Sequence, residues 1–130
     1  SLSERGTSIL RYSWLAPEKV SALLHGASAM VFPSLYEGFG IPILEAFAAG
    51  IPAVTSRGGA PEEVAGGAAL LVDPHNTADI ADAMEWILED DQLRESLVVL
   101  GRERLTHFSW ERCARLTWET ILKASHGNNQ

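Results

Sequence analysis

The fold follows from one stretch of the chain, residues 32–55, which reads FPSLYEGFGIPILEAFAAGIPAVT. A short apolar run that ends at Phe32 predicts a strand, and Ala53-Val54 predicts the next buried strand. Between them, two glycines around a phenylalanine permit backbone conformations that other residues avoid. Pro42 suits the first turn of a helix, and Gly50 suits a helix C-terminus. The stretch therefore predicts a strand, a glycine loop, a helix and a second strand.

The predicted helix begins at the carboxyl end of a strand, so free backbone N–H groups and the positive end of the helix dipole face the glycine loop. Such a site favours an anion, most naturally a phosphate. Glu37 lies in the loop, and Glu45 lies roughly 6 Å along the helix axis from its start. In a nucleoside diphosphate sugar, Glu37 would hold sugar hydroxyls and Glu45 the ribose diol. The alternative is that Glu37 is a solvated loop acid and that Glu45 only complements the helix dipole.

The spacing Glu-x7-Glu, with Gly-Phe-Gly-Ile-Pro between the two acids, resembles the donor site of the retaining GT-B glycosyltransferases called GT4 or glycosyl transferases group 1. The flanking Phe32-Pro33-Ser34 and Gly50-Ile51-Pro52 resemble that family too. The resemblance covers about Ile9 to Trp118 and is densest from Ala29 to Asp73. It implies a catalytic role for Glu37 and donor binding by Glu45, Gly38, Phe39, Gly40, Ile41, Ser13 and Trp14.

The resemblance implies transfer of a hexosyl group from a UDP-, GDP- or ADP-sugar with retention of configuration, and no metal or other cofactor. Two alternatives are a non-catalytic nucleotide-sugar binding module and a GT-B relative such as an epimerase or a sugar phosphorylase. The family also has an N-terminal domain that binds the acceptor, and an Arg and a Lys that hold the diphosphate. No segment before Ser8 supplies these. We therefore expect a fragment or a subunit of a split enzyme, inactive alone, that lacks an N-terminal acceptor domain or partner chain.

Three aromatic or polar residues near the expected site have competing interpretations. In the resembling family the segment around Trp14 lines the base pocket, so its ring could stack on a base, or it could be a core or interdomain tryptophan. The family usually has a small residue there. Phe39 is expected to pack under the loop while neighbouring N–H groups bind the ligand. Ser34 is expected to satisfy the loop backbone rather than to contact a ligand.

The loop after the second strand offers further candidates. Arg57 lies at the right edge to reach a phosphate, although a surface role is the more common one. Gly58-Gly59 followed by Glu63 matches the next motif of the resembling family, and Glu63 is expected to brace this loop rather than to touch substrate.

Composition excludes several classes of function. The 130-residue chain has a net charge of −7 and only ten Lys and Arg, which argues against a nucleic-acid partner. It contains no apolar run long enough to span a membrane and no cluster of Cys and His with metal-ligand spacing. Its single cysteine, Cys113, suits a reducing compartment. We expect a cytoplasmic protein, peripheral to the membrane at most through the absent domain.

Strands alternate with helices along the chain, which predicts an α/β, Rossmann-like parallel sheet flanked by helices, the C-terminal half of a GT-B fold without its first strands. We expect a lead-in at residues 1–7, a domain at 8–124 and a tail at 125–130. The expected strands are Ser8–Ser13, Ala29–Phe32, Ala53–Thr55 and Ala69–Val72. The expected helices are Pro17–Ala27, one from Pro42 to Gly50, Ala60–Ala65, Thr77 to about Asp90, Gln92–Thr106 and Trp110–Lys123, and the apolar stripes of the last three are expected to be core.

The first expected strand raises a difficulty. In the strand order 3-2-1-4-5-6 of this fold, Ser8–Ser13 matches strand 3 and Ala29–Phe32 matches strand 4, while strands 1 and 2 are not in the chain. Both facing edges would then be unpaired. We expect one of three outcomes: the first strand shifts, another chain or a second copy supplies the missing strands, or the segment before Ala29 docks poorly. The second is preferred, because it keeps the expected buried helix Pro17–Ala27 packed, and it makes a homo-oligomer possible.

Overall fold

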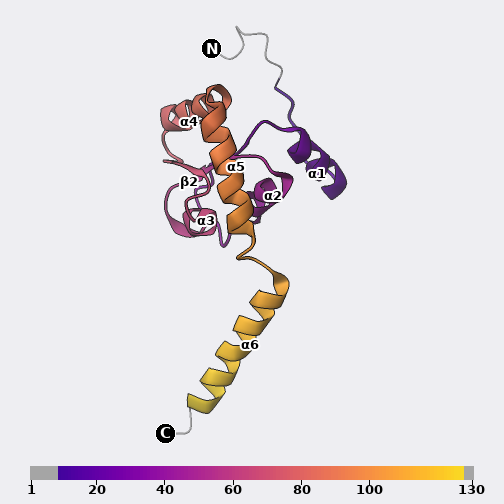
Figure 1. Cartoon of the computed structure of the whole chain (residues 1–130), viewed down its shortest axis with the longest axis vertical. Coiled ribbons are helices and arrows are strands. Elements are labelled where there is room, and N and C mark those ends of the chain that lie inside the picture. The colour runs from indigo at the N-terminus through magenta and orange to yellow at the C-terminus, as the bar shows by residue number, and fades with distance from the viewer. Residues whose placement is uncertain (1–8, 128–130) are drawn as a thin grey trace.

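The computed structural model describes residues 9–127, so the expected lead-in at residues 1–7 and the chain end at 128–130 lie outside the described part. Its helices are α1 (Pro17–Gly26), α2 (Ile41–Ala49), α3 (Gly59–Ala65), α4 (Thr77–Glu89), α5 (Asp91–Leu105) and α6 (Trp110–Gly127). Its strands are β1 (Met30–Phe32), β2 (Ala53–Ser56) and β3 (Leu70–Val72). The strands lie among helices α2 to α5, and α6 extends away from them (Figure 1).

The three strands form one parallel sheet in the order β1-β2-β3. Val31 pairs with Val54, and Thr55 pairs with Leu71. All four positions of β2 are buried, as expected of a central strand whose parallel neighbours require helical crossovers. The predicted α/β class and parallel sheet are therefore confirmed.

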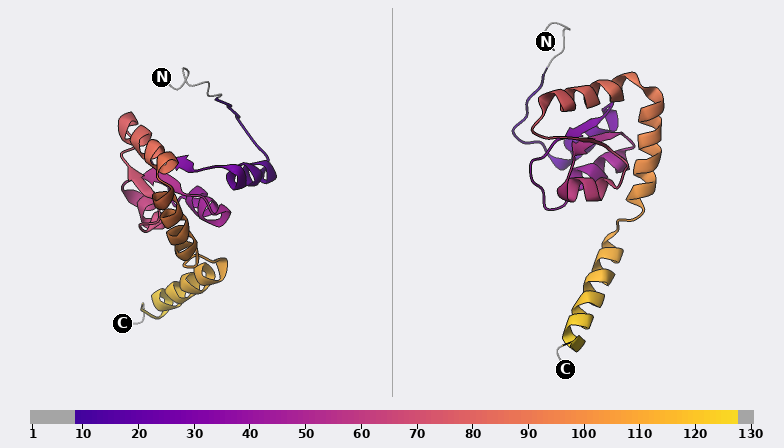
Figure 2. Two further views of the ribbon diagram at one scale, coloured as in Figure 1. Left: turned by 45° about the horizontal axis from the view of Figure 1, so that its top comes forward. Right: turned by 90° about the vertical axis from the view of Figure 1, so that its left-hand side faces the viewer.

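Alternate residues of the strands enter two separate cores. Ala53 joins Ile43, Phe47 and Val64 on the face covered by α2 and α3. Val54 joins a second group on the face covered by α4 and the first half of α5: Val72, Ala83, Ile87 and Leu97. Helices thus cover both faces of the sheet (Figure 2).

Helix α5 passes from one core to the other and packs closely against α2. Leu97 belongs to the core under α4, whereas Leu105 packs against the core under α2. Gly101 is buried, and a Cβ atom there would lie 2.7 Å from Cδ1 of the Phe47 ring. The glycine therefore sets how near α5 can approach α2.

The predicted ends of several helices are confirmed. Gly40 and Gly50, which flank α2, have φ angles of 109° and 73°, values that favour glycine. The side chain of Asn76 accepts hydrogen bonds at the start of α4, and the Ser109 hydroxyl accepts one from the Arg112 N–H at the start of α6.

The expected strand at Ser8–Ser13 is wrong over its described part. Residues 9–13 pair with no strand, and the side chains of Ile9, Leu10 and Tyr12 are 84%, 74% and 59% exposed. A strand needs a neighbour for its ladder hydrogen bonds and a core to cover its apolar side chains, and β1 does not supply these here. Of the three expected outcomes, the described residues fit the third, in which the segment before Ala29 docks poorly.

The expected burial of the first helix is also wrong. Helix α1 has no buried residue, and Leu23 is 56% exposed. Only one side of it, through Leu24, packs against the core under α2.

The stripe of α6 is not core, contrary to the prediction for the last three helices. Trp110 is 83% exposed, Trp118 61% and Ile121 53%. All views show α6 projecting away from the sheet and its helices (Figures 1 and 2). The stripes of α4 and α5 do enter a core, through Ile87 and Leu97.

Replacement of Gly101 by Ala tests the contact between α5 and α2. Overpacking against the buried Phe47 ring costs more than the helix gains from alanine, so Gly101→Ala should lower the free energy of unfolding by about 1–2 kcal/mol. Urea denaturation followed by circular dichroism measures this.

The control is Gly26→Ala in α1, where a Cβ would meet no atom within 4 Å. Its free energy of unfolding should stay within about 0.5 kcal/mol of the parent value. An unchanged stability for Gly101→Ala would show that the Phe47 ring can move aside.

Candidate functional site

The carboxyl ends of the three parallel strands share one edge, where the loops after them come together. The buried Ser56 hydroxyl, at the end of β2, donates a hydrogen bond to the Ser34 carbonyl in the loop after β1. The Arg57 N–H donates to the Val72 carbonyl at the end of β3 over 2.8 Å. The loop of residues 33–40 therefore lies at the edge where ligands of open α/β sheets bind.

The N-terminus of α2 opens onto this loop without a cap. Gly40 is the N-cap residue, no side chain caps the helix, and its first turn holds no acid. Within the described residues, the N–H groups of Gly38, Phe39 and Gly40 have no acceptor. Free N–H groups and the positive end of a helix dipole form a site for an anion.

Glu37 is held in place by its own loop. The Ser34 hydroxyl donates to Oε1 of Glu37 and to the Tyr36 carbonyl, each over 3.1 Å. The Glu37 side chain is half-buried beside the start of α2, whereas that of Tyr36 is 91% exposed. The structure thus places Glu37 in the loop that precedes the N-terminus of α2.

Glu45 is the fifth residue of α2 and lies on its exposed side. Ile43, Ala46 and Phe47 form the buried stripe of the helix, while Ile41 and Glu45 are exposed one turn apart. The carboxylate of Glu45 is therefore available to a ligand that extends past the helix N-terminus.

Phe39 does not pack under its loop as expected. Its ring is 44% exposed and meets the ring of Phe108 edge to face, with 5.9 Å between the centroids. The guanidinium of Arg104 lies 4.9 Å from the centre of the Phe108 ring and also donates to the carbonyls of Glu63 and Val64. The loop is thereby linked to the junction of α5 and α6, which the sequence did not indicate.

The acid that braces the loop after β2 is Glu62 and not Glu63. Oε2 of Glu62 accepts a hydrogen bond from the Gly58 N–H over 2.5 Å, while the Glu63 side chain is exposed. The guanidinium of Arg57 donates to the Leu71 carbonyl over 3.3 Å.

Ser13 and Trp14 are not brought into the sheet. Both side chains are exposed, Trp14 by 77%, in the segment before α1. Their expected place in a base pocket stays a prediction.

An apolar groove of 620 Å³ lies beside the start of α2. The residues that line it come from the loop, α2, the end of α5 and the start of α6: Phe39, Ile41, Leu44, Leu105, His107, Phe108, Ser109, Trp110, Arg112, Cys113 and Leu116. In the first turn of α6, hydrogen bonds from the backbone N–H of Glu111 and from Ser109 lower the pKa of the Glu111 carboxyl.

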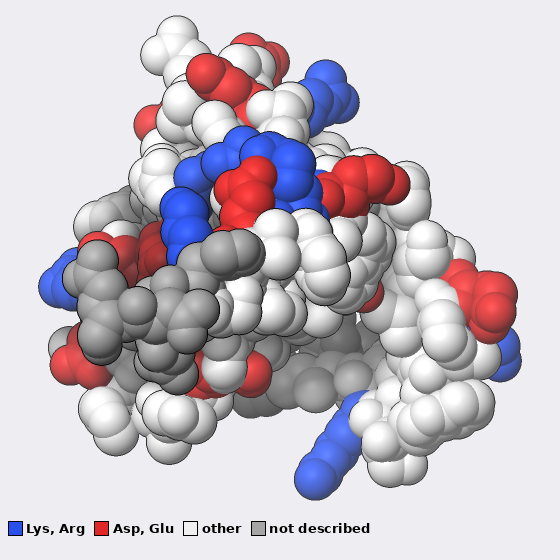
Figure 3. Space-filling model, turned by 90° about the horizontal axis from the view of Figure 1, so that it is seen from below, with Lys and Arg blue, Asp and Glu red and all other residues white. Residues whose placement is uncertain are grey.

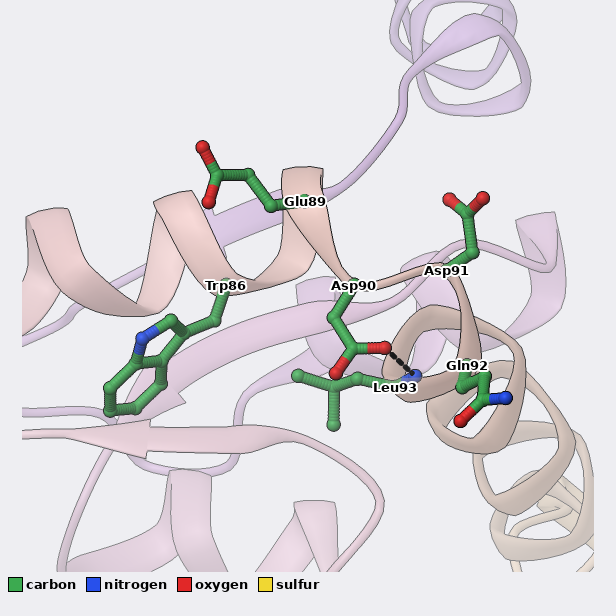
Figure 4. A pocket seen from close by; sticks show the side chains of 6 residues that line it. All are labelled: Trp86, Glu89, Asp90, Asp91, Gln92 and Leu93. Atoms are coloured by element: carbon green, nitrogen blue, oxygen red, sulfur yellow. Dashed lines mark hydrogen bonds between the residues drawn. The ribbon is translucent and has the colours of Figure 1, made fainter.

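A second hollow, of 560 Å³, lies at the turn between α4 and α5 and is lined by acids. Asp90 caps α5 through the Leu93 N–H, while the side chains of Glu89 and Asp91 point away from each other and from Trp86 (Figure 4). The carboxylates of this hollow do not converge on one point (Figure 4).

The described residues offer no group of three His, Cys, Asp or Glu that could hold a metal ion. None of the described helices is long and apolar enough to cross a membrane. On the face seen from below, Lys and Arg are mixed with Asp and Glu and form no uniform basic surface (Figure 3).

Comparison with known proteins identifies similar sequences. The family model described as "Glycosyl transferases group 1" matches residues 6–104. The chain is 40% identical, over 119 residues, to O-antigen chain mannosyltransferase B of Escherichia coli, and the match covers 89% of the chain and 31% of that protein. It is 41% identical, over 112 residues, to the glycogen synthase of Mycobacterium tuberculosis, with 84% of the chain and 27% of that protein covered.

Among solved structures, the chain resembles sucrose-phosphate synthase from Thermosynechococcus elongatus, with a TM-score of 0.72 and 30% sequence identity. The match covers 85% of this chain and 29% of that one. The chain therefore spans about a third or less of the length of these relatives.

The contact between Glu62 and Gly58 can be tested by a pair of neighbouring substitutions. Glu62→Ala removes a charged acceptor of a backbone N–H and should lower the free energy of unfolding by about 1 kcal/mol. Glu63→Ala keeps the carbonyl that Arg104 contacts and should change the stability by less than about 0.5 kcal/mol. Urea denaturation of both variants measures this, and equal losses would contradict the assignment.

Proposed function

The chain belongs to the glycosyl transferases group 1 family, and we propose that it forms the donor-binding part of a retaining, nucleotide-sugar-dependent glycosyltransferase. One observation carries this proposal. The uncapped N-terminus of α2 opens onto a glycine loop that holds Glu37, at the carboxyl edge of a parallel sheet. The family match spans the loop, the helix and all three strands.

The diphosphate of the donor would bind at the start of α2. The N–H groups of Gly38, Phe39 and Gly40 have no acceptor within the described residues, so they can donate to phosphate oxygens. When the bond between sugar and phosphate breaks, negative charge grows on the leaving diphosphate. Fixed N–H donors and the helix dipole stabilise that charge without reorganisation, which is the usual source of such catalysis.

The two carboxylates have distinct proposed roles. Glu37, oriented by Ser34, would accept hydrogen bonds from hydroxyls of the donor sugar and position it for transfer. Glu45, exposed on α2 beyond the first turn, would hold the ribose diol. This order matches the order of parts in a nucleoside diphosphate sugar.

The donor class is proposed as a UDP-, GDP- or ADP-sugar. The relatives carry the names of a mannosyltransferase and of a glycogen synthase, so membership of the family does not select one sugar. The acceptor would bind to a part of the enzyme beyond the third of its length that this chain represents. A partner chain or an N-terminal domain would supply that part.

The function is tested by comparing the 130-residue chain with a protein that joins it to an N-terminal half from a relative. The chain alone should bind a nucleoside diphosphate weakly and give no sustained sugar transfer from UDP-glucose, GDP-mannose or ADP-glucose. The joined protein should transfer sugar from one of them. Product detection by mass spectrometry measures both, and sustained transfer by the chain alone would contradict the proposed division of roles.

The roles of the two acids are tested by alanine substitution. Glu45→Ala should weaken binding of both the nucleoside diphosphate and its sugar, whereas Glu37→Ala should weaken only the sugar-bearing form. Each lost hydrogen bond to a carboxylate should cost about 1.5–3 kcal/mol. Titration of both ligands, followed by NMR, measures these changes.

The matched control is Glu85→Ala, which removes an exposed acid from α4, outside the loops of the proposed site. It should leave both affinities unchanged. If Glu37→Ala weakens the affinity for both ligands equally, the sugar and ribose ends are wrongly assigned.

A further inference from the structure

The central strand ends in two buried polar residues, Thr55 and Ser56, which are 0% and 3% exposed. Buried hydroxyls in a strand need hydrogen-bond partners, and both find them on backbone carbonyls, one at the end of β1 and one in the loop after it. Thr55 Oγ1 donates to the Phe32 carbonyl over 3.1 Å, and Ser56 Oγ donates to the Ser34 carbonyl. The end of β2 thus holds the backbone at the last residue of β1 and at Ser34 in the loop that follows it.

Ser34 extends this connection to the proposed catalytic acid. Its carbonyl accepts from Ser56 while its hydroxyl donates to Oε1 of Glu37 over 3.1 Å. A continuous chain of contacts therefore runs from the sheet through Ser56 and Ser34 to the carboxylate. Within the described residues, Oε2 of Glu37 accepts no hydrogen bond, so one oxygen is held and the other is open to a ligand.

The Ser34 hydroxyl carries a single proton, which it shares between Glu37 Oε1 and the Tyr36 carbonyl. A carboxylate is the stronger acceptor of the two, because hydrogen bonds to ionised groups are stronger than neutral ones. The side chain of Ser34 is therefore suited to restrict the rotamers of Glu37 before any ligand arrives.

We propose that Ser34, anchored by Ser56, is a positioning residue that holds the Glu37 carboxylate in the orientation that accepts the donor-sugar hydroxyls. This inference rests on the proposed function of the same loop. Ser34 should therefore affect the binding of the sugar part of the donor. It should not affect the binding of the nucleotide part, which the N-terminus of α2 and Glu45 would hold.

The experiment compares two ligands on the 130-residue chain, a nucleoside diphosphate and its sugar, with the best binder among UDP-glucose, GDP-mannose and ADP-glucose as the probe. Ser34→Ala should weaken the affinity for the sugar nucleotide by roughly 3- to 10-fold. The affinity for the matching nucleoside diphosphate should stay within twofold of the parent value. Ser34→Thr keeps the hydroxyl, so its affinity for the sugar nucleotide should be within twofold of the parent value.

Ser56→Ala should produce a similar selective loss, because it releases the Ser34 backbone. The double variant that combines Ser34→Ala and Ser56→Ala should lose little more affinity for the sugar nucleotide than either single variant, because both substitutions act through Glu37. The control is Ser96→Ala, which removes an exposed serine hydroxyl from α5, where it donates to the Leu93 carbonyl in the preceding turn of the same helix. NMR spectra of every variant establish that the fold is kept.

The outcomes separate this inference from the function on which it rests. If Glu37→Ala weakens the sugar nucleotide selectively but Ser34→Ala does not, the positioning role is wrong and the proposed function stands. If Ser34→Ala weakens both ligands equally, or if Ser34→Thr fails to restore binding, Ser34 only shapes the loop and the inference is overturned. If Glu37→Ala has no selective effect, the proposed role of Glu37 and this inference both fail.

Discussion

The whole arrangement depends on one constraint, that β2 is buried at all four positions and hydrogen-bonded to a parallel strand on each side. Parallel neighbours must be reached by crossovers, so helices cover both faces of the sheet and the strands end at one common edge. At that edge Thr55 donates a hydrogen bond to Phe32 at the end of β1, and Ser56 donates one to Ser34 in the loop of residues 33–40. Burial of the strand therefore determines where the proposed donor site lies and also supplies hydrogen bonds that hold the start of its loop.

Those features that depend on local chemistry could be predicted from the sequence. Both ends of α2 need a positive φ angle, which favours glycine, and Gly40 and Gly50 stand there. The three strands of the sheet begin and end within one residue of the predicted bounds. The position of the helix N-terminus at which an anion is expected follows from the same local signals, since a glycine loop and a proline in the first turn mark the start of a helix after a strand. For this reason the loop and the exposed side of α2 hold Glu37 and Glu45 as predicted.

Features that depend on distant partners could not be predicted. Ile9 to Ser13 has the composition of a strand, but composition does not supply a neighbouring strand, and the segment stays exposed. The spacing on α6 correctly indicates an amphipathic helix, yet periodicity does not show what covers its apolar side. At the site, adjacent acids cannot be told apart by spacing, so only the structure shows that Glu62 holds the loop after β2. The contact of Phe39 with Phe108 joins residues far apart in the chain and left no signal in the sequence.

The distribution of charge indicates how a diphosphate could be held by so acidic a chain, whose net charge is −7. The start of α2 supplies about half a positive charge, well short of neutralising a diphosphate. Arg57, the basic residue at the same edge, has its guanidinium on the Leu71 carbonyl in β3. Within the described residues, binding of a diphosphate at this edge would therefore depend on directed N–H donors rather than on an excess of positive charge. Donors of that kind act best when the loop that carries them is held in place, and the hydroxyls of Thr55 and Ser56 hold the start of that loop at Phe32 and Ser34.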